Sequence, residues 1–349
     1  PNIRPMIIKQ LAGTGWTQEN LLLLPSHSHS SLEMFALNNR NVFNMPAIGI
    51  FQPKLMAFVV DKLAGLIAET DRHLKPVRIG TGQVHLQGMN RSRRGDRAVD
   101  QALTLTRIDL RDNRPLAVLV NWSAHPTIMD EEDMWVSAGW PGYLQRELED
   151  WIGKNVLAMF YNGAQGDQSV IAQGAGSHYE MAENYGRKLA KHARQLYENI
   201  VPSEKNYFRY THSKVDLPAR TAHPSFMQTG GKEYALDEQT IQGLLDQVFP
   251  STTTVCALRL GELLIVGAPG EMSAALGLDI KSNLNAAGIA YPVIGGLANE
   301  WISYFLTEAQ YHQGGYESSV SFYGPSLGET MRDHMLKTAL MLIKPDVSP

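Results

Sequence analysis

Residues 21–30 read LLLLPSHSHS, an apolar run that leads directly into a His-x-His pattern. The run predicts a buried strand, and in an extended chain residues two apart point to the same side. His27 and His29 are therefore expected to project together from the end of that strand. Two imidazoles on one face suit a metal site or proton transfer. Two polar residues at a solvated strand end are the alternative that this pattern alone leaves open.

Apolar runs and helical periodicity alternate along the chain. Apolar runs predict strands at 21–24, 102–110, 117–124, 156–161, 207–217, 255–260 and 263–266. Apolar spacings of three and four predict helices at 53–74, 142–152, 182–200, 237–248, 273–286 and 329–343. The alternation predicts an α/β fold of mixed, layered β-sheets flanked by helices, in a single large domain. Residues 218–234 lack periodicity and are expected to form a surface loop beside a site.

The composition is that of an ordinary globular protein. The chain has 349 residues, 44% apolar and 19% charged, with a net charge of −4. Residues 91–94 form the one short basic run, which argues against nucleic acid as a partner. The single cysteine, Cys256, lies in an apolar run and is expected to be a buried, inert thiol. No apolar run reaches the length of about 18 residues that a membrane-spanning helix needs.

A second histidine motif follows the apolar strand predicted at 117–124. Residues 121–127 read NWSAHPT, which places His125 at the exit of that strand. Functional side chains often gather at such strand ends. A histidine satisfied locally by hydrogen bonds before the turn at Pro126 is the alternative.

A third motif combines a strand end with a glycine-containing turn. Residues 160–169 read FYNGAQGDQS, and the glycines allow a tight turn that exposes backbone N–H groups. The motif is neither a phosphate-binding P-loop nor a Gly-x-Ser-x-Gly nucleophile elbow. Ser169 is a candidate nucleophile, with an ordinary loop serine as the alternative.

Two further motifs carry acids and tyrosines. In residues 265–272, IVGAPGEM, Glu271 follows a strand and a Pro-Gly turn. It suits a metal ligand or a general base, or simply an acid near the first turn of the next helix. Residues 299–319 are dense in tyrosine and glutamate, including Tyr304 and Tyr316. They indicate either a polar pocket or an aromatic surface for carbohydrate or lipid.

Taken together, the motifs resemble those of the neutral ceramidases, zinc amidases that cleave the N-acyl bond of ceramide. The resemblance rests on six segments that occur in the family's order along nearly the whole chain: 27–30, 90–92, 121–127, 164–169, 269–273 and 304–319. It implies a zinc ion held by His27, His125, Glu271 and Tyr304. Two imidazoles, a carboxylate and a phenolic oxygen are a suitable ligand set that leaves room for a water.

The resemblance also implies roles for four other residues. His29 would take a proton from the attacking water and pass it to the leaving amine. Arg91 and Tyr316 would stabilise the oxyanion of the tetrahedral intermediate. Ser169 would contact substrate or support the site, and less readily act as the nucleophile, because a metal-bound hydroxide needs no serine.

The chain also departs from the family pattern. Residues 31–35, SLEMF, replace the glycines that follow His-x-His in the family, so the pocket mouth and the substrate are expected to differ. The family's N-terminal strand-rich region and its C-terminal immunoglobulin-like domain are not recognised in residues 1–349. An N-terminal fragment that associates with this chain is therefore one expectation. The resemblance further implies an amphipathic N-acyl amide substrate, peripheral membrane contact, and a secreted or periplasmic location.

Two other functions are compatible with these motifs. One is a metal-independent serine hydrolase that uses Ser169, which chelators would not inhibit. The other is a non-catalytic module that binds a lipid or a sugar in the same pocket. The joint presence of His27, His29, His125, Glu271 and Tyr304 favours the zinc amidohydrolase over both.

Overall fold

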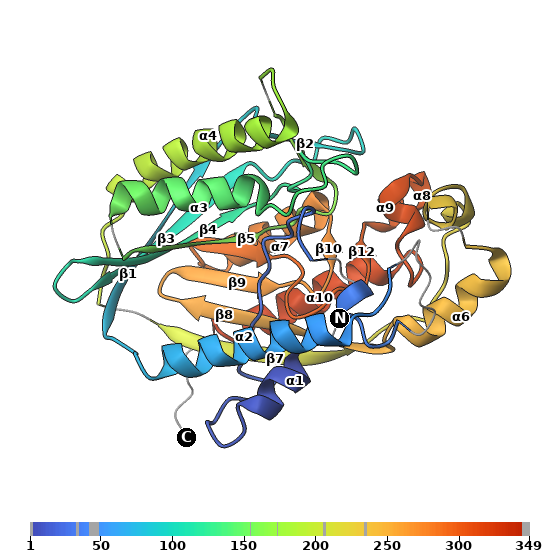
Figure 1. Ribbon diagram of the computed structural model, residues 1–349, viewed down its shortest axis with the longest axis horizontal. Coiled ribbons are helices and arrows are strands. Elements are labelled where there is room, and N and C mark those ends of the chain that lie inside the picture. The colour runs from blue at the N-terminus through green and yellow to red at the C-terminus, as the bar shows by residue number, and fades with distance from the viewer. Residues whose placement is uncertain are drawn as a thin grey trace.

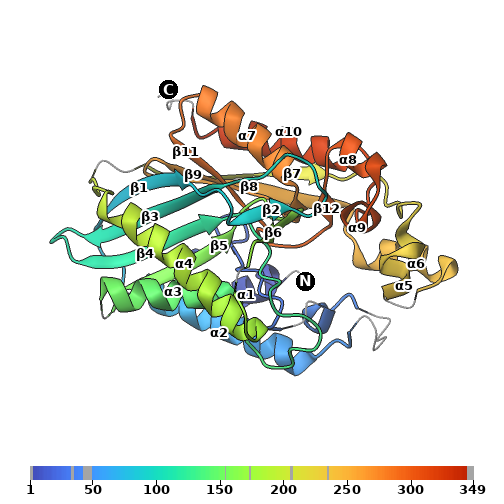
Figure 2. The same cartoon turned by 90° about the horizontal axis from the view of Figure 1, so that it is seen from above.

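Two four-stranded β-sheets stack face to face, with helices on both outer faces (Figures 1 and 2). The structure is a computed structural model, and it describes residues 3–32, 35–41, 49–153, 155–172, 174–204, 207–233 and 236–343. The four layers are helix, sheet, sheet and helix. The predicted α/β fold with mixed sheets flanked by helices is confirmed.

The first sheet has the strand order β1-β3-β4-β5. Its strands are β1 (Val77–His85), β3 (Ala102–Leu110), β4 (Pro115–Trp122) and β5 (Leu157–Asn162). β3 is antiparallel to both β1 and β4, whereas β4 and β5 are parallel. Two helices, α3 (Gly139–Ile152) and α4 (His178–Glu198), pack on its outer face. Buried leucine, valine and tryptophan side chains, including Trp122 and Trp140, fill the space between helices and sheet.

The second sheet has the strand order β11-β9-β8-β7. Its strands are β7 (Phe208–Asp216), β8 (Thr252–Leu260), β9 (Leu263–Gly267) and β11 (Tyr291–Gly295). β9 and β11 are parallel, and the other pairs are antiparallel. α7 (Ala274–Ala286) and α10 (Leu327–Leu340) cover its outer face. Cys256 on β8 is buried, as expected.

A small apolar core joins the two sheets. Tyr161, Leu263, Ile265 and Val293 are its buried members. The Asn121 side-chain amide crosses from the first sheet to donate to the Ile294 carbonyl at 3.0 Å. This contact fixes the ends of β4 and β11 relative to each other.

Short elements surround this sandwich. Two two-stranded sheets pair β2 (Asn90–Ser92) with β6 (Gln168–Val170), and β10 (Glu271–Met272) with β12 (Tyr304–Phe305). α1 (Arg4–Gln10) and α2 (Pro53–Asp71) pack against each other along one side of the sheets (Figure 1). The remaining helices are η1 (Phe35–Leu37), η2 (Phe226–Gln228), α5 (Gly230–Glu233), α6 (Glu238–Val248), α8 (Glu308–Gln313) and α9 (Tyr316–Ser319). None of the described helices has the length and apolar character needed to cross a bilayer.

Two expectations about local structure are wrong. Residues 21–24 form no strand. Instead, the Asn299 backbone N–H donates a hydrogen bond to the Leu23 carbonyl at 2.9 Å. Residues 218–233 are not simply a surface loop, because they contain η2 and α5 and bury Phe226 at 2% exposure. In both places, tertiary contacts determine the conformation. Tyr234, the last residue of the expected loop, lies outside the described residues.

Candidate metal centre

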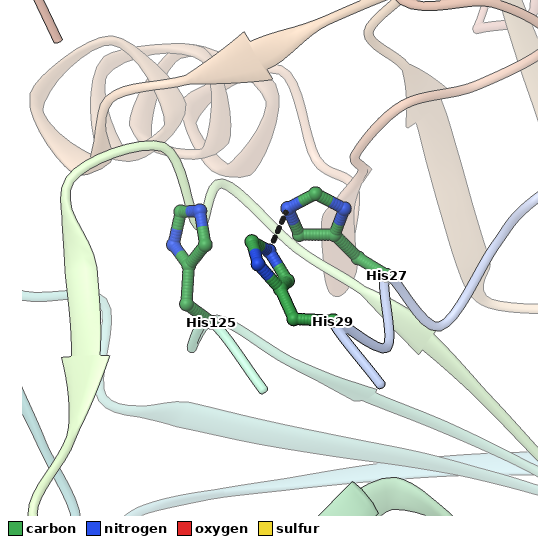
Figure 3. A group of neighbouring side chains, drawn as sticks. All are labelled: His27, His29 and His125. Carbon is green, nitrogen blue, oxygen red and sulfur yellow. Dashed lines mark hydrogen bonds between the residues drawn. The ribbon is translucent and has the colours of Figure 1, made fainter. Parts of the chain in front are cut away.

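Three histidines from distant parts of the sequence face one another (Figure 3). His27 and His29 come from the N-terminal segment, and His125 comes from the loop that follows β4. One ring nitrogen from each lies within 4.8 Å of the others, and the Nε2 atoms of His27 and His29 are 3.1 Å apart. The expectation that His27 and His29 project together therefore agrees with the structure, although no strand carries them.

His125 is fully buried and held by its surroundings. Its backbone N–H donates to the Gln168 carbonyl at 2.9 Å, and its Nδ1 lies 3.1 Å from the same oxygen. The Asn162 amide, at the end of β5, donates to the carbonyl of Ala124 at 3.0 Å. Because Nδ1 faces a carbonyl, we assign the ring proton to Nδ1, which leaves the lone pair of Nε2 pointing into the centre.

Glu271 supplies a buried carboxylate opposite His125. Its Oε2 lies 2.8 Å from His125 Nε2 and 3.5 Å from His27 Nε2. The Trp301 indole N–H donates to its Oε1 at 2.8 Å. Burial by itself would raise the pKa of Glu271, but His27 and His125 hold that pKa well below its ordinary value. The carboxylate is therefore ionised.

The contact between His125 and Glu271 provides a test for a bound cation. With its proton on Nδ1, His125 presents a lone pair to a carboxylate oxygen, so a positive ion or a proton must lie between the two acceptors. Imidazole nitrogens and a carboxylate oxygen are common zinc ligands. The donor set of His27, His125 and Glu271 thus fits zinc.

His29 lies on the solvent side of the same cluster. Its ring centroid is 4.5 Å from that of His27 and 5.7 Å from that of His125. Desolvation of the imidazole lowers the pKa of His29, and the neighbouring histidines lower it further. The imidazole is therefore neutral at pH 7. A ring nitrogen of His29 lies within 4.8 Å of those of His27 and His125, so the geometry also allows His29 to be a ligand.

Tyr304 lies beside Glu271 because β10 and β12 pair in parallel, with these two residues opposite each other. Its side chain is buried, with 6% exposure. Burial, and then the charge of Glu271, raises the pKa of Tyr304 well above its ordinary value. Its hydroxyl is therefore protonated where it faces the carboxylate.

The structure brings Arg93 to the centre and leaves Arg91 outside it. Arg91 on β2 is exposed and pairs through its backbone with Ser169. Arg93 has Tyr304 and Glu271 among the groups that act on its guanidinium. It also donates to the Gly166 carbonyl at 2.7 Å and pairs with Glu317 at 3.0 Å. β2 ends at Ser92, and the chain then turns toward the centre. Arg93 therefore reaches the centre, whereas Arg91, the residue that the motif indicates, does not.

Tyr316 lies at the mouth of the centre. It begins α9, is 40% exposed, and its ring centroid lies 6.2 Å from that of Tyr304. Together with Arg93, Arg94 and Glu317 it lines a cavity of about 500 Å³. The cavity therefore has a phenol and a guanidinium in its lining, and Arg93 is also among the charges that act on His29 and His125.

Ser169 contacts the centre through its backbone. It forms an isolated parallel bridge with His125. Among the residues that the structure describes, no imidazole or carboxylate accepts a hydrogen bond from the Ser169 hydroxyl. A serine nucleophile needs such a base, so this geometry gives no support to the metal-independent hydrolase.

Sequence reasoning missed three residues that shape the centre: Arg93, Asn162 and Trp301. Asn162 and Trp301 stand inside the motifs at 160–169 and 299–319, but their hydrogen bonds join segments far apart in the chain. Gly166 is also required, since a Cβ at this position would lie 2.6 Å from the Glu271 carbonyl oxygen. A glycine in a motif after a strand is a signal for such close approach.

Comparisons with known proteins point to one group of enzymes. No family model matches the chain. Neutral ceramidase of Pseudomonas aeruginosa is 24% identical over 393 residues, which covers 89% of this chain and 57% of that protein. Neutral ceramidase 1 of Arabidopsis thaliana is 31% identical over 86 residues, or 22% of this chain and 11% of that protein. The chain therefore spans little more than half the length of the Pseudomonas relative.

Solved structures show the same fold. The crystal structure of the Pseudomonas aeruginosa neutral ceramidase matches with a TM-score of 0.81 at 18% identity, covering 98% of this chain and 64% of that one. A ceramidase complexed with C2 matches with a TM-score of 0.78 at 16% identity, covering 100% of this chain and 67% of that one. The chain is thus a homologue of the neutral ceramidases and shares their fold.

Proposed function

We propose that this chain is a zinc-dependent amidohydrolase that cleaves the N-acyl amide bond of ceramide or of a related N-acyl lipid. The observation that carries the proposal is the buried contact of 2.8 Å between His125 Nε2 and Glu271 Oε2, with His27 beside it. The similarity to neutral ceramidases over 89% of the chain supports the choice of an amide lipid as substrate.

The metal ligands in this proposal are His27, His125 and Glu271, with Tyr304 as the fourth. Zinc bound there would act as a Lewis acid on the scissile carbonyl and would lower the pKa of a bound water to about 7. Trp301 keeps the Glu271 carboxylate oriented by its hydrogen bond to Oε1. The Gln168 carbonyl holds the ring of His125 through Nδ1. Such partners of the ligands fix their orientation and strengthen metal binding.

His29 is the proton carrier in this mechanism. Its imidazole would accept a proton from the attacking water and then donate it to the nitrogen of the leaving amine. Its position at the rim gives it access to solvent and to substrate.

Arg93 takes the role that the motif comparison assigned to Arg91. In this proposal its guanidinium and the Tyr316 hydroxyl, which line the same cavity, donate hydrogen bonds to the oxyanion of the tetrahedral intermediate. The ion pair with Glu317 orients the guanidinium. Arg91, which is exposed, is not expected to affect the reaction.

Residues 1–349 act as one catalytic unit in this proposal, because the ligands come from both sheets. His125 follows β4 of the first sheet, and Glu271 follows β9 of the second. Residues 31–35 are expected to shape substrate preference. Leu32 is 47% exposed, while residues 33 and 34 lie outside the described part of the chain.

The experiment combines zinc analysis with hydrolysis of a panel of N-acyl amides that includes ceramide. We expect one zinc per chain and chelator-sensitive hydrolysis of at least one amide. His29→Ala should retain zinc and lose activity by about 10²-fold or more, as general acid–base groups do. Arg91→Ala is the matched control for Arg93→Ala and should leave the rate unchanged. Chelator-insensitive hydrolysis that is abolished by Ser169→Ala would refute the proposal in favour of a serine hydrolase.

A further inference from the structure

One loop of this molecule projects three large apolar side chains into solvent. Met134, Trp135 and Val136 are 85%, 79% and 83% exposed, and we call them the apolar tip. Within the described ranges no other three consecutive large apolar residues are exposed. Trp135 is also the one exposed tryptophan among the six of the chain, all of which are described. Exposed apolar surface of this kind commonly marks an interaction site.

The apolar tip is held in a fixed position by the start of α4. The Trp135 backbone N–H donates to the Tyr179 hydroxyl at 3.1 Å. Beside it, His178 Nδ1 lies 2.7 Å from the Asp133 carboxylate. These bonds tie the loop to α4, while the side chains of the apolar tip remain exposed.

The base of the same loop contacts the segment that carries His27 and His29. The Ser137 backbone N–H donates to the Ser30 carbonyl at 2.7 Å. The Ser28 hydroxyl donates to the Ser137 carbonyl at 2.8 Å. The apolar tip is therefore joined directly to the solvent side of the histidine cluster.

The charges next to the apolar tip determine which surface it fits. Asp130, Glu131 and Glu132 precede the tip and are exposed, and Asp133 follows them. The His178 Nδ1 lies 3.6 Å from the Asp130 carboxylate and 2.7 Å from the Asp133 carboxylate. This acidic group repels an anionic membrane surface. Tryptophan side chains favour the boundary between lipid and water, where an apolar ring and a polar N–H are both accommodated.

We propose that the apolar tip inserts into the surface of a zwitterionic lipid layer and thereby holds the His29 side of the centre against it. A substrate with an acyl chain would then pass from the layer to the centre without crossing bulk water. The identity of that substrate rests on the proposed function, but insertion itself does not depend on catalysis.

Vesicles of pure phosphatidylcholine provide the direct test. We expect the full chain to co-sediment with them, and brominated phosphatidylcholine to quench the fluorescence of Trp135. Trp135→Ser should weaken partition by about tenfold or more, which corresponds to about 1.4 kcal/mol. Leu74→Ser, which alters a side chain that is 76% exposed outside this loop, is the matched control and should partition like the wild type.

A second variant protects the test against misfolding. Trp135→Phe keeps an aromatic side chain, so it should retain most of the partition while losing the quenching. Partition of Trp135→Ser equal to that of the wild type would overturn the proposal. Absence of partition by the wild type would also overturn the proposal, and it would favour a protein partner bound at the apolar tip. Stronger binding to phosphatidylserine than to phosphatidylcholine at low salt would overturn the choice of a zwitterionic surface.

Activity assays separate this inference from the proposed function. Trp135→Ser should hydrolyse a water-soluble short-chain amide at the wild-type rate, and hydrolyse the same amide bond in vesicles more slowly, in step with its partition. Vesicle partition that depends on Trp135, in a protein that hydrolyses no amide, would support the tip and reject the proposed function.

Discussion

The two halves of the metal centre are built in different ways. His125 and Glu271 follow strands of the two sheets, are 0% and 5% exposed, and are fixed by several hydrogen bonds. His27 and His29 belong to a segment that has no regular structure and borders solvent. His27 also has a φ of 64°, in the left-handed region that a non-glycine residue seldom adopts.

This difference indicates which half needs the metal. The sheet half is positioned by the fold itself, whereas the N-terminal half carries an unfavourable backbone conformation of the kind found at functional sites. A bound ion that draws His27 toward Glu271 would offset this cost. The predictions below therefore treat the two halves separately.

The largest effect is expected from the sheet half. His125→Ala or Glu271→Gln should remove zinc and lower kcat by about 10³-fold or more, because the proposed chemistry depends on the ion. Metal analysis and amide hydrolysis measure both effects. His85→Ala, at the exposed end of β1, is the control. Full zinc content in His125→Ala would exclude this residue as a ligand.

The pH dependence of stability should report on the turn that supports the sheet half. Burial raises the pKa of Asp167 to about 6, while its carboxylate accepts a hydrogen bond from the Ala274 backbone N–H at 2.8 Å. The folded state therefore binds the proton more tightly than the unfolded state. The stabilisation that protonated Asp167 contributes to the folded state is fully present below about pH 4. It is lost as the pH rises to about 6, which lowers the free energy of unfolding by about 3 kcal/mol.

Asp167→Asn tests this titration. Urea unfolding of the metal-free protein between pH 4 and 7 should show a smaller fall in the free energy of unfolding for the variant than for the wild type. Other titrating groups contribute to both proteins alike. Parallel pH profiles for the two proteins would show that Asp167 does not titrate in this range.

Substitution of one histidine from each half should separate folding from metal binding. In the metal-free protein, His125→Ala removes a buried, hydrogen-bonded side chain and should lower the free energy of unfolding by about 1–3 kcal/mol. His27→Ala, at the solvent boundary, should change it by less than about 0.5 kcal/mol. Both should lose zinc. An equal loss of stability in the two metal-free variants would contradict the contrast between the halves.

The smallest effect concerns the anchor of the N-terminal segment. The Asn299 side-chain oxygen accepts a hydrogen bond from the Leu23 backbone N–H at 2.9 Å. Asn299→Gly removes that acceptor and still permits the φ of 71° at this position. We expect zinc affinity to fall by about five- to tenfold, equivalent to about 1 kcal/mol. The control is Asn283→Ala, which removes an exposed asparagine side chain on α7. Alanine is used there because glycine would weaken the helix.

The sequence predicted the sheet half of the centre better than the N-terminal half. Residues placed just after strands, such as His125 and Glu271, come together because β4 and β9 end at the same side of the sandwich. No strand forms at 21–24, because Leu23 is hydrogen-bonded to Asn299, which lies 276 residues further along the sequence. Local patterns contain no information about such a contact.

Two other differences have local physical causes. β1 was not predicted, since Gly80 and Gly82 interrupt its apolar pattern. Gly80 is needed there, because a Cβ at this position would lie 2.7 Å from the Ile200 side chain and 2.9 Å from the Val201 carbonyl oxygen. Arg91 was placed in the centre by a motif, but the end of β2 at Ser92 turns Arg93 inward instead. The point at which a short strand ends is hard to read from sequence.

The zinc content of the purified chain tests the central claim most directly. The measurement is made after zinc supplementation and dialysis, on the wild type beside His125→Ala and His29→Ala. The account predicts one equivalent in the wild type and in His29→Ala, and less than about a tenth of an equivalent in His125→Ala. Less than a tenth of an equivalent in the wild type would contradict a zinc centre built from His27, His125 and Glu271.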